Sequence, residues 1–351
     1  MKIILSIGHP TPGTLHLRQR LAGAWSQLAA QHVLLPALSP ASQAWTLAQA
    51  ITAENEAGRP APADLAQEHA LLGSNHNITQ GSLKAQMQHV APATVLLFPA
   101  SSDSSEDATN AARTALAKLL HKAEVHLYCA LPRPDLHLER LLTRRISDGA
   151  PLGALAAETE ALLDSPHVDY RQLLAPWLTL FPKAPLHLHA AQDPDAEIAR
   201  YCEIAGLPAL PDLSIAPQQP RPLPRALLDP MRLANALAPG DFDFHAELQS
   251  RLGQCTLPQD ADVELFGAEI RQRLHDSFAP VAEALAQHTG GGAAFEDLDA
   301  ILRPRPIPLD QLHTSFLRAL PGFPTTLFRP RLHALRQQLK KKRSDKSAAA
   351  C

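Results

Sequence analysis

The stretch that decides the fold is KIILSIGHPTPGTL, residues 2–15. Residues 2–8 form a short, β-branched and apolar run that ends at a glycine, which is typical of a fully buried parallel strand. The prolines that follow, together with Gly13, predict a turn. The apolar spacing over residues 14–31 is helical and predicts a helix. The chain is therefore expected to open as strand, loop and helix.

The same alternation of strand and helix continues over about the first 210 residues. Further buried strands are predicted at residues 94–98, 125–131 and 185–189. Helices are predicted at 106–121, 135–146, 152–164, 169–181 and 194–205, and two more within residues 36–92. Strands that alternate with helices favour an α/β fold of three layers, with a mostly parallel central sheet covered on both faces.

The pattern changes after residue 208. The seven prolines from Pro208 to Pro230 predict a linker or an extended wrap. Beyond them only helical patterns follow, near residues 225–237, 242–253, 261–288 and 309–320. We expect three parts: an α/β core over 1–210, a Pro-rich linker and helical C-terminal extension packing on it over 211–338, and a basic flexible tail over 339–351.

Composition excludes several classes of protein. A net charge of −3 gives no general attraction to nucleic acid or to anionic membranes. No apolar run approaches the roughly 18–20 residues of a membrane span, and the N-terminal run is too short for a signal peptide. The four cysteines are scattered and form no CxxC pair, which argues against a disulfide framework or a structural zinc site. A cytoplasmic protein with no membrane span and no nucleic-acid partner is expected.

The loop after the first strand has the features of an anion site. The N–H groups of a helix's first turn have no partner within the helix, and the helix dipole favours negative charge there. Gly13 and Thr14 stand at this helix start. His9 and His16 flank the loop and are candidates for a general base that accepts a hydroxyl proton.

Residues 7–15 resemble the opening of bacterial sulfotransferases that use phosphoadenosine phosphosulfate (PAPS) and modify surface polysaccharides. That opening reads Ile-Gly-Thr-His-Lys-Thr-Gly-Thr-Thr. The matching positions are Ile7, Gly8, Gly13 and Thr14. The family's lysine falls on Thr11, which carries no charge, and the next position falls on Pro12, which removes a backbone donor.

A second and longer resemblance to the same sulfotransferases follows. It covers a strand that enters a helix, a Gly-Pro turn, an Asp-Tyr-x-x-Leu-Leu motif and a helix end, at residues 125–145, 148–153, 169–174 and 205–207. The family's arginine after the strand falls on Pro132, beside Arg133, and the family's serine falls on Arg140. A guanidinium is a good partner for phosphate, so Arg133 and Arg140 are the expected contacts of the donor's 3′-phosphate.

The resemblance implies a P-loop-like fold, PAPS as the donor and a glycan hydroxyl as the acceptor. Its implied donor-site residues are Gly8, Thr11, Gly13, Thr14, Arg18, Arg133 and Arg140, with Arg18 as the charge that replaces the missing lysine, and His9 or His16 as the base. A P-loop kinase or nucleotidase is a weaker reading, because the chain has no Gly-Lys-Ser/Thr.

Two functions remain open at this point. The chain is either a divergent sulfotransferase, or a catalytically inactive protein of that fold that acts as a binding or scaffold subunit in surface-polysaccharide assembly. The changes at Thr11, Pro132 and Arg140 favour the second. His187 and His189 alternate on one strand face, but no third ligand is evident near them, so no metal site is predicted.

Overall fold

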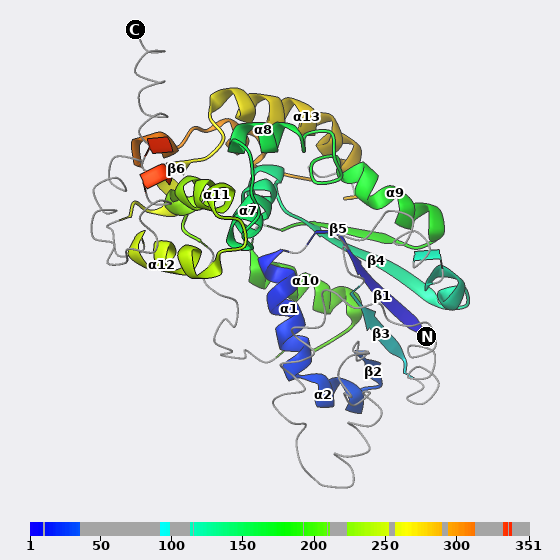
Figure 1. Cartoon of the computed structure of the whole chain (residues 1–351). Coiled ribbons are helices and arrows are strands. Elements are labelled where there is room, and N and C mark those ends of the chain that lie inside the picture. The colour runs from blue at the N-terminus through cyan, green and yellow to red at the C-terminus, as the bar shows by residue number, and fades with distance from the viewer. Residues whose placement is uncertain are drawn as a thin grey trace, which may run out of the picture. The chain divides into compact units, whose positions relative to one another are not determined.

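The computed structural model (Figure 1) describes residues 1–9, 11–35, 92–98, 113–114, 116–191, 193–208, 210, 223–252, 257–289, 294–312, 333–335 and 337–338. The helices predicted within 36–92 and the tail predicted over 339–351 lie outside these residues. The chain divides into two compact units. Unit 1 comprises Met1–Arg133, Tyr170–Ala216 and Val281–Glu296; unit 2 comprises Pro134–Asp169, Pro217–Pro280 and Asp297–Cys351.

Unit 1 contains a five-stranded sheet in which all strands are parallel (Figure 1). The strands are β1 (Lys2–Ile7), β2 (Val33–Leu34), β3 (Thr94–Leu97), β4 (Glu124–Leu131) and β5 (Leu186–Ala190). Their order across the sheet is β2-β3-β1-β4-β5. The prediction of an α/β fold with a parallel central sheet is therefore confirmed.

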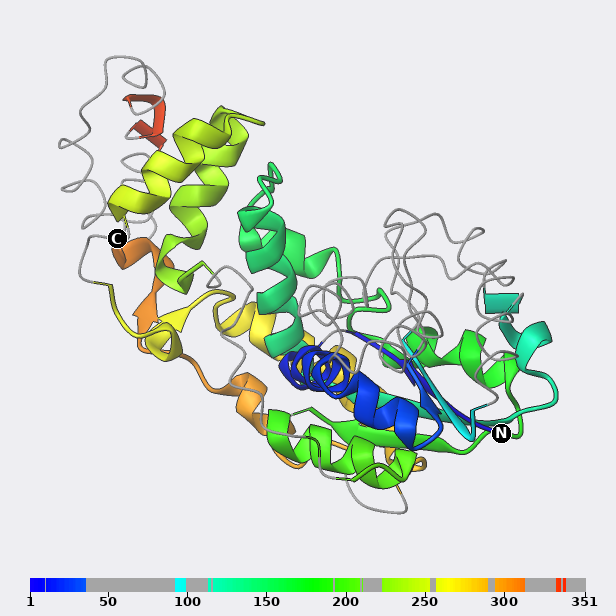
Figure 2. The ribbon, with the colours of Figure 1, turned by 90° about the horizontal axis from the view of Figure 1, so that it is seen from below.

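The position of β1 at the centre of the sheet explains its apolar run from Ile3 to Leu5. Consecutive side chains of a strand point to opposite faces, yet Ile3, Ile4 and Leu5 are all fully buried. One face is covered by α1 (Pro12–Gly23) and α10 (Pro194–Ala205), which pack against each other. Figure 2 shows α1, in dark blue, running alongside the strands. The shared core includes Ile4, Leu17, Leu21, Tyr128, Ile198 and Tyr201.

The first predicted helix differs from the observed one at both ends. α1 begins at Pro12 because Thr11 is its N-cap, and proline is well tolerated in the first helical turn. The helix ends at Gly23, and a separate short helix, α2, runs over Trp25–Ala30. Of the other predicted elements of unit 1, those that fall on described residues are present: residues 113–114 and 116–120 are helical, and α9 spans Tyr170–Leu180.

Unit 2 contains the helices α7 (Pro134–Ser147), α8 (Leu155–Glu160), α11 (Leu228–Leu237) and α12 (Phe242–Leu252), and the first part of α13 (Ala268–Ala286). It also contains a two-stranded parallel sheet of β6 (Val263–Glu264) and β7 (Ile307–Pro308). The prediction that only helices follow residue 208 is therefore wrong. Two-residue strands are too short to leave an alternating pattern in the sequence.

A buried ion pair connects the segments of unit 2. The Arg271 side chain is about 2% exposed, and its Nε donates to both Glu264 carboxylate oxygens at 2.9 and 2.8 Å. Arg271 Nη1 also donates to the Ile301 carbonyl at 3.0 Å, and the Arg305 backbone N–H donates to Glu264 at 2.9 Å. Burial raises the pKa of Glu264, but these hydrogen bonds outweigh it and hold the pKa below its ordinary value.

None of the helices in the described part of the chain combines the length and the apolar character that crossing a bilayer requires.

Candidate functional site at the carboxyl edge of the sheet

The carboxyl ends of β1 and β4 lie side by side, with Ile7 opposite Cys129. The chain leaves β1 toward β2 on one side of the sheet, whereas from β4 it goes on to β5 on the other side. Such a reversal is the topological switch point of an open α/β sheet, where ligands bind beyond the carboxyl ends of the strands. The residues that follow these two strands therefore form the candidate site.

The loop after β1 lies very close to β4. Gly8 has a φ of +114°, and a Cβ on it would lie 2.9 Å from Cys129 Sγ, so the position requires glycine. The next residue, His9, is buried, and its ring centroid lies 5.7 Å from that of Tyr170. The Tyr170 hydroxyl donates to the Pro132 carbonyl just beyond β4, at 2.8 Å. His9 therefore lies at the switch point, and its role as a general base stays a prediction.

The first turn of α1 uses most of its own hydrogen-bond donors. The Thr14 N–H donates to Thr11 Oγ1 at 2.9 Å, and the Thr11 N–H donates to Thr14 Oγ1 at 2.7 Å, which is a reciprocal capping box. The Leu15 N–H donates to the Thr11 carbonyl at 3.1 Å. Pro12 has no N–H. Of the three residues Pro12, Gly13 and Thr14, only Gly13 has an N–H outside these contacts.

A carboxylate from α10 lies against this turn. Glu197 is 1% exposed, and both its carboxylate oxygens accept from the Thr11 hydroxyl at 2.8 Å. A Cβ on Gly13 would lie 2.3 Å from Glu197 Oε2, so the carboxylate is in close contact with the helix backbone. The pKa of the Cys129 thiol on β4 is raised, mainly by burial and then by the negative charge of Glu197. A carboxylate of the protein itself therefore lies at the start of α1. The sequence around Thr11, Gly13 and Thr14 does not predict this contact.

Arg18 lies over an aromatic ring. Its guanidinium carbon is 5.0 Å from the ring centroid of Phe98, which follows β3. Burial lowers the pKa of Arg18 to about 10, which still leaves it charged at neutral pH. The position of Arg18 reflects packing and a cation–π contact.

The remaining predicted site residues belong to both units. His16 is exposed on α1, Arg133 is half-buried in unit 1, and Arg140 is exposed on α7 in unit 2. His16 as the general base, and Arg133 and Arg140 as donor contacts, stay predictions.

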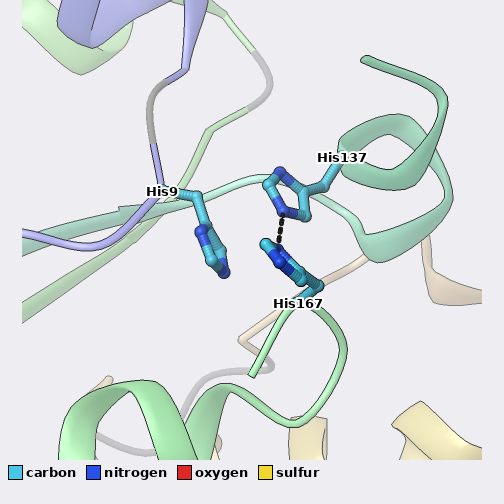
Figure 3. A group of neighbouring side chains, drawn as sticks. All are labelled: His9, His137 and His167. Atoms are coloured by element: carbon cyan, nitrogen blue, oxygen red, sulfur yellow. Dashed lines mark hydrogen bonds between the residues drawn. The ribbon is translucent and has the colours of Figure 1, made fainter. Parts of the chain in front are cut away.

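Two histidines that the sequence analysis did not single out lie together in unit 2. His137 is in the first turn of α7 and is 6% exposed, and His167 is in the segment before α9. His137 Nε2 and His167 Nδ1 are 3.1 Å apart and share a hydrogen bond. Figure 3 shows this pair, with the hydrogen bond drawn as a dashed line.

A second histidine pair lies in unit 1. His187 on β5 faces His126 on β4, with Nε2 and Nδ1 3.0 Å apart and the rings parallel within 6°. Glu124 Oε1 lies 2.9 Å from the other ring nitrogen of His126. Burial lowers the pKa of His187, and the charges of His126, Arg200 and Lys2 lower it further.

This depressed pKa predicts that acid destabilises the protein. The unfolded chain binds a proton at His187 with a pKa of about 6.5, whereas the folded chain resists it, so stability is present above that pH and falls as the pH drops below it. The melting temperature of the wild type is expected to fall more between pH 8 and pH 5.5 than that of His187→Gln. The exposed His121→Gln is the control, and an equal fall in all three proteins would contradict the prediction.

The fold and this edge together define a parallel α/β protein with a polar site at a switch point. A scan against protein-family models and searches of curated proteins and of solved structures found no match for the chain.

Proposed function

We propose that this protein is a non-catalytic relative of PAPS-dependent sulfotransferases that acts as a binding or scaffold subunit in surface-polysaccharide assembly. The proposal joins the sequence resemblance, which supplies the fold family and the glycan context, to one observation of the site. That observation is the buried carboxylate of Glu197 at the start of α1.

The Glu197 carboxylate disfavours binding of the sulfate donor at the first turn of α1, where the sulfotransferase resemblance would place it. A phosphosulfate bound by the first turn of α1 would bring negative charge close to Glu197. Two like charges 4 Å apart repel by about 4 kcal/mol at an effective dielectric constant of 20. Since each 1.4 kcal/mol is a factor of ten, affinity would fall by about 10²–10³-fold.

The absence of the family's lysine also argues against sulfuryl transfer. Thr11 stands at the lysine position, and its hydroxyl donates to Glu197 rather than into the loop. Removing one preorganised donor from a transition state costs roughly 10²–10³ in rate. Low affinity and low rate together leave no useful sulfuryl transfer, whereas binding of a neutral or extended glycan does not require the phosphosulfate loop.

A transfer-and-binding experiment tests the proposal. The protein is incubated with PAPS labelled in its sulfuryl group and with a panel of bacterial surface polysaccharides, and is separately immobilised and exposed to the same panel. We expect no label transfer above a protein-free control, and retention of at least one polysaccharide in the absence of PAPS. Transfer that disappears in Arg133→Ala and Arg140→Ala would favour the sulfotransferase instead. Retention of no polysaccharide would contradict the scaffold role.

A further inference from the structure

Three polar side chains without hydrogen-bond partners lie on the sheet face that α1 and α10 cover. Tyr201 on α10 is fully buried and Ser6 on β1 is 7% exposed, yet neither hydroxyl has a hydrogen-bond partner among the described residues. The buried Nε of Arg18 on α1 has none among them either. Native proteins pair nearly all of their buried polar atoms, so these three groups call for an explanation.

Aromatic contacts bring the three groups together. The Arg18 guanidinium carbon lies 5.0 Å from the Phe98 ring centroid, and Phe98 stacks on Tyr201 with centroids 5.8 Å apart. Tyr201 packs edge-on against Tyr128, which is the residue that pairs with Ser6 in the sheet. Burial raises the pKa of the Tyr201 hydroxyl, whereas Ser6 and Arg18 lower it. Both side chains are therefore close neighbours of this hydroxyl.

Arg18 supplies a positive charge that no carboxylate of the described residues balances. Its contacts are with the Phe98 ring and with Tyr201. Arg20, on the same helix, is by contrast paired with Asp195 at 3.1 Å. A charge that is partly removed from water is costly unless it is paired. One cation beside two hydroxyl donors is a suitable set of partners for a small anion.

We infer that Arg18, Ser6 and Tyr201 bind one small carboxylate ion. The two oxygens of a carboxylate match the planar fork of a guanidinium, and its single negative charge balances that of Arg18. Glu197 lies one turn before Tyr201 on α10, so its charge disfavours phosphate and other multiply charged anions at this place. All of these residues belong to unit 1. The inference is independent of the proposed function, because neither PAPS nor a glycan takes part.

Saturation-transfer NMR on the full chain, with acetate as the probe at constant ionic strength, tests this site. We expect a saturable signal with a dissociation constant roughly in the millimolar range, since a ligand of so few atoms makes few contacts. The affinity is expected to fall about tenfold or more in Arg18→Gln and in Tyr201→Phe, because a hydrogen bond to a charged group contributes at least that much. Formate is expected to displace acetate, and phosphate is not.

Arg20→Gln is the matched control, because Arg20 lies on the same helix and is already paired with Asp195. It is expected to bind acetate as the wild type does. Tyr201→Phe keeps the ring that packs on Phe98 and Tyr128, so its melting temperature without acetate separates loss of a donor from loss of folding. The inference is overturned if the wild type gives no acetate signal, if Arg18→Gln binds as tightly as the wild type, or if phosphate competes as well as formate.

Discussion

Replacing Glu264 with alanine is expected to lower the free energy of unfolding by about 3–5 kcal/mol. The change leaves the Arg271 guanidinium, 2% exposed, without its carboxylate. A buried charge that loses its partner costs far more than the pair contributes, because the cation stays desolvated. The Arg305 and Phe266 backbone N–H groups lose their acceptor as well.

Urea denaturation of the full chain, followed by circular dichroism, measures this effect. Glu269→Ala is the control, because Glu269 is exposed near the start of the same helix, α13, and surface changes usually stay within about 0.5 kcal/mol. A loss of less than about 1 kcal/mol in Glu264→Ala would show that the ion pair is not buried as described.

The lowered pKa of Glu264 also predicts how its contribution to the stability of the protein changes with pH. Because the folded chain holds Glu264 ionised at a pH where the unfolded chain protonates it, its contribution is present above about pH 4.3 and is lost as the pH falls through the lower folded pKa. The stability difference between the wild type and Glu264→Ala is therefore expected to shrink at low pH. An unchanged difference from pH 7 to pH 3 would contradict this.

Gly13→Ala is expected to destabilise the protein by about 1–3 kcal/mol, the usual cost of overpacking. A loss of stability would be informative, because replacing glycine with alanine within a helix otherwise stabilises a protein by roughly 0.5–1 kcal/mol. The new methyl group would lie 2.3 Å from the Glu197 carboxylate, which must then move from its hydrogen bonds to Thr11.

A double-mutant cycle attributes the effect to this contact. Glu197→Ala is expected to remove most of the cost of Gly13→Ala, with a coupling of about 0.5–3 kcal/mol between the two positions. Gly153→Ala is the control, because its methyl group would meet only the end of the Glu158 side chain, at 3.2 Å. If the stability changes of Gly13→Ala and Glu197→Ala simply add, the Glu197 carboxylate does not contact Gly13 and the prediction is contradicted.

The strands were predictable because burial on both faces leaves a direct trace in the sequence. β1, β3 and β4 are short apolar runs between turn residues, and their predicted and observed limits differ by one residue or less at each end. Their order in the sheet has no such trace, because it depends on pairing between distant segments. β6 and β7 were missed for a different reason: each has only two residues, which is too short to leave an alternating pattern in the sequence.

The candidate site was predictable only in part. His9 could be placed because it directly follows a strand, at the edge where α/β sheets bind ligands. Glu197 could not, because an acidic residue in the first turn of α10 is what an exposed helix start also shows. Its role depends on the packing of α10 against α1, which brings residues 11 and 197 together.

The most direct test of the account is calorimetric titration of the wild-type protein with adenosine 3′,5′-bisphosphate, the stable product of the sulfate donor. We predict no heat of binding and no rise in melting temperature, because Glu197 lies against the turn that would hold the donor. Saturable micromolar binding that is lost in Arg133→Ala and Arg140→Ala would contradict the account and restore the donor site.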